Sequence, residues 1–259
     1  MAGLGSGYDI SVSTFSPDGR VFQVEYASKA VDAAPLCLAA ACKDGVVFAA
    51  EVPRVSPLLT KGANKVIFQV NEEIGLVFGG LLSDGRRLWG RARAEAANYK
   101  SAFGVSIPLG VLAERLSLFV HSFTLYWHLR PFGVTCLLGG LQPNPKSGFR
   151  ELTGEIYAID PSGCCCRFFA AAAGRERPAA KTELEKLNLK AAAAAAAAAD
   201  LVRLLLQLGE ESQKENKKEI QVAVINSQNG KVNFHFWQQQ QVAAAVAAAQ
   251  QAIQAMDSD

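Results

Sequence analysis

The sequence predicts an α+β protein in which two β-sheets are stacked between two layers of helices. Candidate strands come in blocks along the 259 residues instead of alternating singly with helices, which argues against a doubly wound parallel sheet. Two long helices between the strand blocks have wide apolar faces and must cover one sheet face. Helices late in the chain need the face of a second sheet.

The first expected element is a helix at about residues 20–32, preceded by a tight turn. Residues 16–19, Ser-Pro-Asp-Gly, predict a type I turn, because Pro17 presets φ at its second position. Apolar residues then recur at spacings of three and four, as in an amphipathic helix: Val21, Val24, Ala27 and Val31. Residues 1–14 are rich in Gly and Ser and predict a mobile tail, so we divide the chain into this tail and one domain at 15–259.

The next elements are two hairpins and two helices. Residues 36–51 and 64–80 each contain two apolar runs around a polar turn, which predicts hairpins. A helix is expected from residue 83, with Ser83 or Asp84 as its N-cap. A second helix follows Pro108 and ends before Pro131. Its apolar face comprises Leu109, Leu112, Ala113, Leu116, Phe119, Val120 and Phe123.

The last third of the chain continues the pattern. We expect a buried strand at 134–140, a hairpin at 154–174 around Asp160-Pro161-Ser162-Gly163, a helix from Pro178, and a strand with a turn at 218–234. A Gln/Ala helix at about 237–256 closes the chain. The nine alanines at 191–199 favour helix by propensity. These Ala and Gln tracts are either genuine or stand in for unidentified residues, and we assign them no function.

Composition and motifs exclude several functions. A net charge of +2 is too small to argue for nucleic-acid binding, and no apolar run reaches membrane-spanning length or forms a signal peptide. The six cysteines contain no CxxC, and Cys164, Cys165 and Cys166 are consecutive, so successive thiols would point to opposite faces of a strand. This favours a reducing intracellular compartment without disulfides.

No cofactor or metal is expected. Phosphate-binding, serine-hydrolase and zinc-protease motifs are all absent. His121 and His128 lie seven apart on the expected helix, but no third ligand is evident. The basic residues of 86–93 open a helix and predict a solvated face or a subunit contact, with phosphate or RNA binding as an alternative.

Residues 8–31, YDISVSTFSPDGRVFQVEYASKAV, resemble the N-terminal signature of α-type subunits of the 20S proteasome. The resemblance continues through CKDGVVFAAE, NKVIFQV, GGLLSDGR, YAIDPSG and AAKTELEKL. Residues 7–31 and 130–133 are most similar to the family member that occupies the seventh ring position. The resemblance implies the N-terminal nucleophile hydrolase fold, a four-layer αββα sandwich.

The resemblance also implies partners and a location. The chain would join neighbouring α-type subunits in a heteroheptameric ring, contact β-type subunits of the adjacent ring, and receive a regulatory particle or other activators. Its role would be in ubiquitin-dependent protein degradation in cytoplasm and nucleus.

The resemblance implies that this chain is not catalytic. The β-type relatives use an N-terminal threonine with a nearby Asp and Lys, and the free α-amine can act as the base. Pro35 stands at the position of that threonine, Glu51 at that of the Asp, and Lys65 near that of the Lys. An active threonine protease of the same fold, or a scaffold subunit without a gating role, are the alternatives.

Two groups of site residues follow from the resemblance. Tyr8, Asp9, Pro17 and Tyr26 match residues that order the N-terminal tails which close the axial pore; Ile10 replaces an Arg found in sister subunits. Lys65, Gly79, Gly80 and Leu81 match a pocket between neighbouring subunits that receives activator C-termini. Lys65 can equally be a solvated lysine at a strand end, or a relic of the catalytic lysine.

Overall fold

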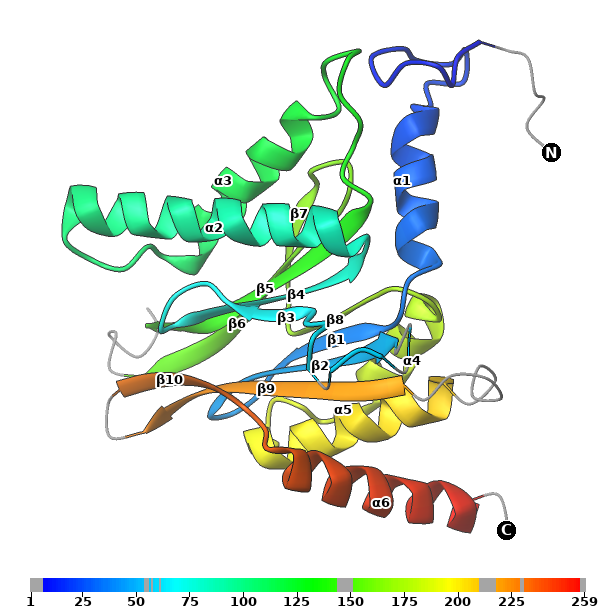
Figure 1. Ribbon diagram of the computed structural model, residues 1–259. Helices are drawn as coiled ribbons and strands as arrows, with labels where there is room; N and C mark the ends of the chain where they lie inside the picture. The colour runs from blue at the N-terminus through cyan, green and yellow to red at the C-terminus, as the bar shows by residue number, and fades with distance from the viewer. Residues whose placement is uncertain are drawn as a thin grey trace.

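The expected four layers are present in the computed structural model, which describes residues 7–53, 56, 58–60, 62–143, 151–209, 218–228 and 231–256. Figure 1 shows two stacked sheets with helices above and below them. Part of the predicted tail, residues 1–6, lies outside the described residues. Within the described part, no helix is long and apolar enough to span a bilayer.

Each sheet has five antiparallel strands. Sheet I has the order β10-β9-β2-β1-β8 and sheet II the order β3-β4-β5-β6-β7. The strands of sheet I are β1 (Cys37–Ala41), β2 (Gly45–Pro53), β8 (Ala170–Ala173), β9 (Lys218–Gln228) and β10 (Lys231–Phe236). The strands of sheet II are β3 (Ile67–Gln69), β4 (Ile74–Gly80), β5 (Val134–Pro143), β6 (Leu152–Ile159) and β7 (Cys165–Phe168). The hairpins predicted at 36–51 and 64–80 are therefore confirmed. The one predicted at 154–174 is confirmed only as far as Phe168, because the chain then passes from β7, at the edge of sheet II, to β8, at the edge of sheet I.

The helices cover the outer faces. Helices α2 (Leu82–Phe103) and α3 (Leu109–Ser122) lie over sheet II, while α5 (Ala194–Gly209) and α6 (Gln239–Met256) lie beneath sheet I, with α4 (Arg177–Lys186) near β8 (Figure 1). The helix expected from Pro178 is thus two helices. Helix α1 (Phe22–Asp32) stands beside the sheets and leads directly into β1.

Where the two sheets face each other, the aromatic ring of Phe48 packs against two glycines. Gly75 and Gly139 face each other across β4 and β5. A Cβ on Gly75 would lie 2.8 Å from the Phe48 ring, and a Cβ on Gly139 would lie 2.7 Å from it. Because both positions lack a side chain, the ring of Phe48, which is fully buried, fills the space between the sheets.

The alanine tract contributes to the core beneath sheet I. Ala194, Ala197 and Ala198 lie on the buried face of α5 and pack with Leu201 and Leu205 in one apolar cluster. Alanine suits this place because its small side chain lets the helix lie close to β1 and β2. The predicted helical state of the tract is confirmed from Ala194 onward.

The predicted N-cap of α2 is wrong, because Asp84 has another partner. Helix α2 begins at Leu82, so Asp84 lies inside its first turn. Its buried carboxylate accepts hydrogen bonds from Arg130, at 2.7 and 2.9 Å, and from the backbone N–H of Gly133, at 2.9 Å. Burial raises the pKa of Asp84, but these hydrogen bonds outweigh it and the pKa lies below its usual value. The contact ties α2 to the segment before β5.

We expect Asp84→Asn to lower the free energy of unfolding by about 2 kcal/mol at neutral pH, because a charged pair and its bond to Gly133 are weakened. Since the folded pKa is depressed, the wild-type advantage is complete above the unfolded pKa of about 3.9 and is lost as pH falls through the folded pKa. Urea unfolding at a series of pH values measures this. Asp18→Asn, at an exposed turn position, is the control and should show no such difference; equal curves for Asp84→Asn and wild type would contradict the role of Asp84.

Candidate functional site

The N-terminal segment is fixed to the domain by the Ser16 turn. The N–H of Gly19 donates to the Ser16 carbonyl at 2.9 Å, and Gly19 has φ +73°, which glycine adopts without strain. The Ser16 N–H donates to the Arg20 carbonyl at 2.9 Å, and Ser16 Oγ accepts from the Arg20 N–H at 3.1 Å. Ser16 is buried. The predicted turn is therefore confirmed, and hydrogen bonds between Ser16 and both Gly19 and Arg20 close it.

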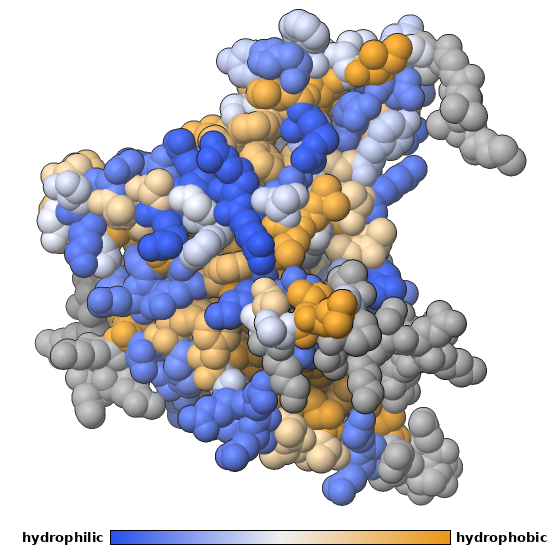
Figure 2. Space-filling view, in the orientation of Figure 1, coloured by the Kyte–Doolittle hydropathy of each residue, from blue (hydrophilic) through white to orange (hydrophobic). Residues whose placement is uncertain are grey.

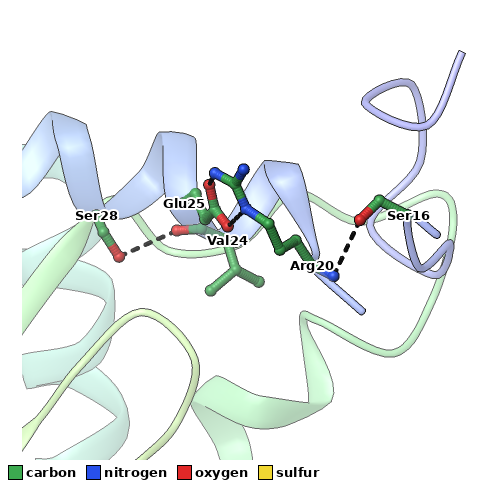
Figure 3. Close-up of polar contacts among 5 residues, drawn as sticks. All are labelled: Ser16, Arg20, Val24, Glu25 and Ser28. Atoms are coloured by element: carbon green, nitrogen blue, oxygen red, sulfur yellow. Dashed lines mark hydrogen bonds and ion pairs between the residues drawn. The ribbon is translucent and has the colours of Figure 1, made fainter. Parts of the chain in front are cut away.

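The start of α1 has side-chain contacts but no side-chain N-cap (Figure 3). Arg20 forms a bidentate pair with Glu25, with Nε donating to Oε1 at 2.7 Å. Ser28 Oγ donates to the Val24 carbonyl at 3.1 Å. Before the turn, the side-chain amide of Gln23 donates to the Asp9 carbonyl, so the segment folds back on α1.

The structure does not bring the four predicted gate residues together within one chain. Tyr8 and Tyr26 are 37% and 38% exposed, and Pro17 is exposed at the turn. Among the described residues, no hydrogen bond joins Tyr8 or Asp9 to Tyr26. Tyr26 instead stacks on Phe22, with ring centroids 6.4 Å apart, and lies under the Lys29 ammonium. Half-exposed tyrosines, with an apolar ring and a polar end, are typical of residues that meet a partner chain.

The residue that the resemblance places at the nucleophile's position is a proline in mid-chain. Pro35 lies between α1 and β1, and its carbonyl packs against Gly174, where a Cβ would lie only 2.3 Å from that oxygen. Glu51 is buried next to it, and its backbone N–H donates to the Leu36 carbonyl at 3.0 Å. Pro35 offers neither a hydroxyl nor a free amine, so nucleophilic catalysis of the threonine type has no group to start from.

A residue that sequence analysis did not identify, Gln221, fixes the backbone on both sides of Lys65. The side-chain amide of Gln221, on β9, donates to the Asn64 carbonyl at 2.7 Å and accepts from the Val66 N–H at 3.3 Å. Both neighbours of Lys65 are thereby fixed to sheet I. The exposed Lys65 ammonium lies 5.6 Å from the centroid of the Phe236 ring. Residues about 155 positions apart form this clamp, which no local pattern could reveal.

The four predicted pocket residues do lie at one end of sheet II. Ile67 pairs with Val77, and Phe78 N–H donates to the Val66 carbonyl, which puts Lys65 level with Gly79. The glycines also serve internal packing. A Cβ on Gly79 would lie 3.1 Å from the Ala173 backbone, and one on Gly80, at φ +134°, would lie 2.2 Å from the Gly133 oxygen.

His128 and Arg91 have local partners in the structure. Helix α3 ends at Ser122, so His128 lies in the following loop and not on the predicted helix. There it contacts the rings of Tyr126 and Trp127. Arg91 pairs with Glu95 and lies over the Phe119 ring. No cluster of three metal-ligating side chains occurs in the part of the chain that the structure describes.

An apolar surface was not predicted. Leu125, Tyr126 and Trp127 are 54%, 54% and 76% exposed at the tip of the loop after α3. Ile10 and Phe15 are also largely exposed. Figure 1 shows the loop beside the N-terminal segment, and Figure 2 shows apolar side chains at that end of the molecule. The sequence signal is an aromatic run before a proline, but the helix predicted up to Pro131 includes this run.

Comparison with known proteins gives one consistent result. The family described as "Proteasome subunit" matches residues 31–225, and the N-terminal signature of the proteasome's α-type subunits matches residues 8–30. The alpha type-3 proteasome subunit of Arabidopsis thaliana is 38% identical over 259 residues, covering all of both chains. Its alpha type-3 counterpart in Oryza sativa is 40% identical over 263 aligned positions, also covering all of both chains. The probable alpha type-7 proteasome subunit of Saccharomyces cerevisiae is 44% identical over 187 residues, 72% of this chain and 62% of that protein.

We expect Gly80→Ala to destabilise the fold by at least about 3 kcal/mol, because the strained φ and the Gly133 oxygen both oppose a Cβ. Gly90→Ala is the matched control. Gly90 lies inside α2 with open space around its Cα, so this change should stabilise by about 0.5–1 kcal/mol. Thermal unfolding of both variants measures the two effects. A Gly80→Ala chain as stable as wild type would show that the backbone at the end of β4 can shift to accommodate a Cβ, which would contradict this prediction.

Proposed function

The chain belongs to the proteasome subunit family and is of its α type, which forms the noncatalytic rings of the 20S core particle, and from this premise we propose that it helps to gate the axial pore and to dock activators. The observation that carries the gating proposal is the closed Ser16 turn, which joins a Gly- and Ser-rich tail to a rigid helix. A tail that blocks and reopens a pore needs such a fixed base, because otherwise its closed position would be undefined.

The exposure of Tyr8 and Tyr26 supports a gate made by several chains. Each tyrosine has an apolar ring and a free hydroxyl at the surface, and the single chain supplies no partner for either hydroxyl among its described residues. We propose that the partners are groups of neighbouring α-type subunits in a heteroheptameric ring. The exposed loop tip at 125–127 supports the same arrangement, since aromatic residues are enriched where protein surfaces meet.

The docking proposal is supported by a positioned cation. A peptide C-terminus is a carboxylate, and an exposed lysine whose backbone is clamped on both sides presents its ammonium in a defined place. The half-exposed Leu81 supplies an apolar contact at the same end of the sheet. We propose regulatory particles or other activators as the source of that carboxylate, β-type subunits as the second ring contact, and cytoplasm and nucleus as the locations in which ubiquitin-dependent degradation uses the particle.

Deletion of residues 2–11 should raise basal peptide hydrolysis by the assembled particle, because the tail no longer contributes to closing the pore. We expect partial opening, since Ile10 cannot supply the charged contact that an Arg makes in sister subunits. Fluorogenic peptide turnover by purified particles, normalised to β-subunit content, measures this. Pro17→Ala, which keeps the tail but loosens its base, should open the pore less than the deletion. Unchanged turnover by an intact deletion particle would favour the scaffold alternative.

Lys65→Ala should weaken binding of an activator C-terminal peptide at this pocket by roughly ten- to a hundredfold, as expected for loss of a hydrogen bond to a charged group. Gln221→Ala keeps the ammonium but frees its backbone, so it should weaken binding by a smaller factor. Site-specific crosslinking or cryo-EM occupancy of this pocket measures both. Lys29→Ala, an exposed lysine on α1, is the control and should bind like wild type. Equal occupancy in Lys65→Ala and wild type would show that the lysine is a solvated residue.

A further inference from the structure

The three consecutive cysteines occupy two different environments. Cys164 and Cys166 are exposed, and their Sγ atoms lie 3.9 Å apart. Cys165 lies between them in sequence but is half-buried and packs against the apolar cluster beneath α2 and α3. Burial raises the pKa of its thiol to about 11. The alternation expected of an extended chain therefore separates one inward thiol from a pair of outward ones.

The outward pair is held by a rigid turn. The Asp160 carboxylate accepts hydrogen bonds from the N–H groups of Ser162, at 2.9 Å, and of Cys164, at 3.1 Å. The Asp160 N–H in turn donates to the Cys164 carbonyl at 3.1 Å. Helix α3 also fixes the turn, because Ser117 Oγ on this helix donates to the Gly163 carbonyl at 2.6 Å. These bonds fix the backbone of Cys164, and the pairing of Cys166 with Ala158 on β6 fixes that of Cys166, so the backbone holds the two thiols close together.

From this geometry we propose that Cys164 and Cys166 form a reversible redox modification site, a dithiol that closes an internal disulfide on reaction with a small-molecule disulfide such as glutathione disulfide. Residues i and i+2 of an extended chain have Cα atoms about 6.6–6.8 Å apart, at the upper limit that a disulfide tolerates. The bond can therefore close without rearrangement of β7 but remains strained. Strained, exposed disulfides are the readily reduced ones.

The reaction balances in two exchange steps. The thiolate of one cysteine attacks a sulfur of glutathione disulfide, which forms a mixed disulfide and releases one glutathione thiolate. The second protein thiol, after loss of its proton to solvent, attacks the protein sulfur of the mixed disulfide and releases the second glutathione, and the two glutathione thiolates take up the two protons. The protein loses two electrons and two protons, and glutathione disulfide gains them. Excess reduced dithiol reverses the process.

The hydrogen bond between the two thiols raises the pKa of Cys164. The second exchange step should be fast once the mixed disulfide has formed, because the attacking protein sulfur already lies next to the protein sulfur of the mixed disulfide. Cys165 is excluded from both steps, since its sulfur faces the core and its thiol ionises only at high pH. The mixed disulfide should therefore not accumulate on the native chain.

The test uses 20S particles that contain this chain, incubated with glutathione disulfide, then denatured in the presence of excess N-ethylmaleimide and digested with trypsin. Cleavage after Arg150 and Arg167 gives one peptide with all three cysteines. In wild type we expect this peptide to lose two hydrogen atoms and to carry a single N-ethylmaleimide group, at Cys165. Dithiothreitol should restore three reactive thiols. The Cys165→Ala variant is the matched control and should form the internal disulfide in the same yield as wild type.

Single removal of an outward thiol should change the product. Cys164→Ser and Cys166→Ser should accumulate a mixed disulfide with glutathione on the remaining outward cysteine and form at least tenfold less internal disulfide. Wild-type yield of internal disulfide in Cys164→Ser would assign the reaction to Cys165 and Cys166 and overturn the proposal. A wild-type peptide that stays reduced, or stays glutathionylated, would overturn it equally, whether or not a synthetic peptide of residues 160–168 oxidises in the same buffer.

Discussion

The seating of one phenylalanine ring on two glycines is the constraint on which the rest of the architecture depends. Phe48 comes from β2 of sheet I, while Gly75 and Gly139 form a cross-strand pair of sheet II. Stacked sheets with ordinary side chains lie about 10 Å apart. Because Gly75 and Gly139 lack side chains, the Phe48 ring fills the space opposite both of them, together with the Phe234 ring at Gly75, and this packing fixes the lateral position of one sheet on the other. The ends of β1, β2 and β3 are therefore placed relative to each other by a contact in the middle of the core, and those ends carry Pro35, Glu51 and Lys65.

The same placement explains how a hydrolase scaffold persists without its reaction. A fold supplies positions, and the chemistry depends on which groups occupy them. Glu51 remains buried beside the start of β1, but Pro35 removes both the hydroxyl and the free amine on which threonine catalysis depends. Lys65 keeps its place because Gln221 fixes the backbone on both sides of it, and its ammonium extends over the Phe236 ring. A lysine so placed presents its cation at the protein surface.

Local sequence patterns predicted most elements of the fold, and failures occurred where a distant residue decided the outcome. The turn at 16–19, the blocks of strands and the apolar face of α3 all follow from spacing and turn chemistry, which neighbouring residues determine. Asp84 looked like an N-cap, but Arg130, 46 residues later, supplies its partner. Gln221 and Asn64 are further apart still. The resemblance to a family supplied the candidate site residues; the separation of Cys164 and Cys166 from Cys165 needed both the strand alternation and the observed burial.

The end of β4, where we propose that activators dock, lies close to the segment before β5 and to α1. The Leu81 N–H donates to the Gly133 carbonyl at 2.9 Å. A Cβ on Gly133 would lie 2.9 Å from Leu81 Cδ1 and 3.7 Å from the Cβ of Ala30 on α1, and Asp84 holds the same glycine from the other side. Closely packed groups of this kind move together and do not deform gradually. The end of β4, the segment before β5 and α1 therefore form one packed region, and the Ser16 turn is joined to it through α1. In the gate that we propose, the chain before Ser16 is the part that switches, and this packed region is its fixed base.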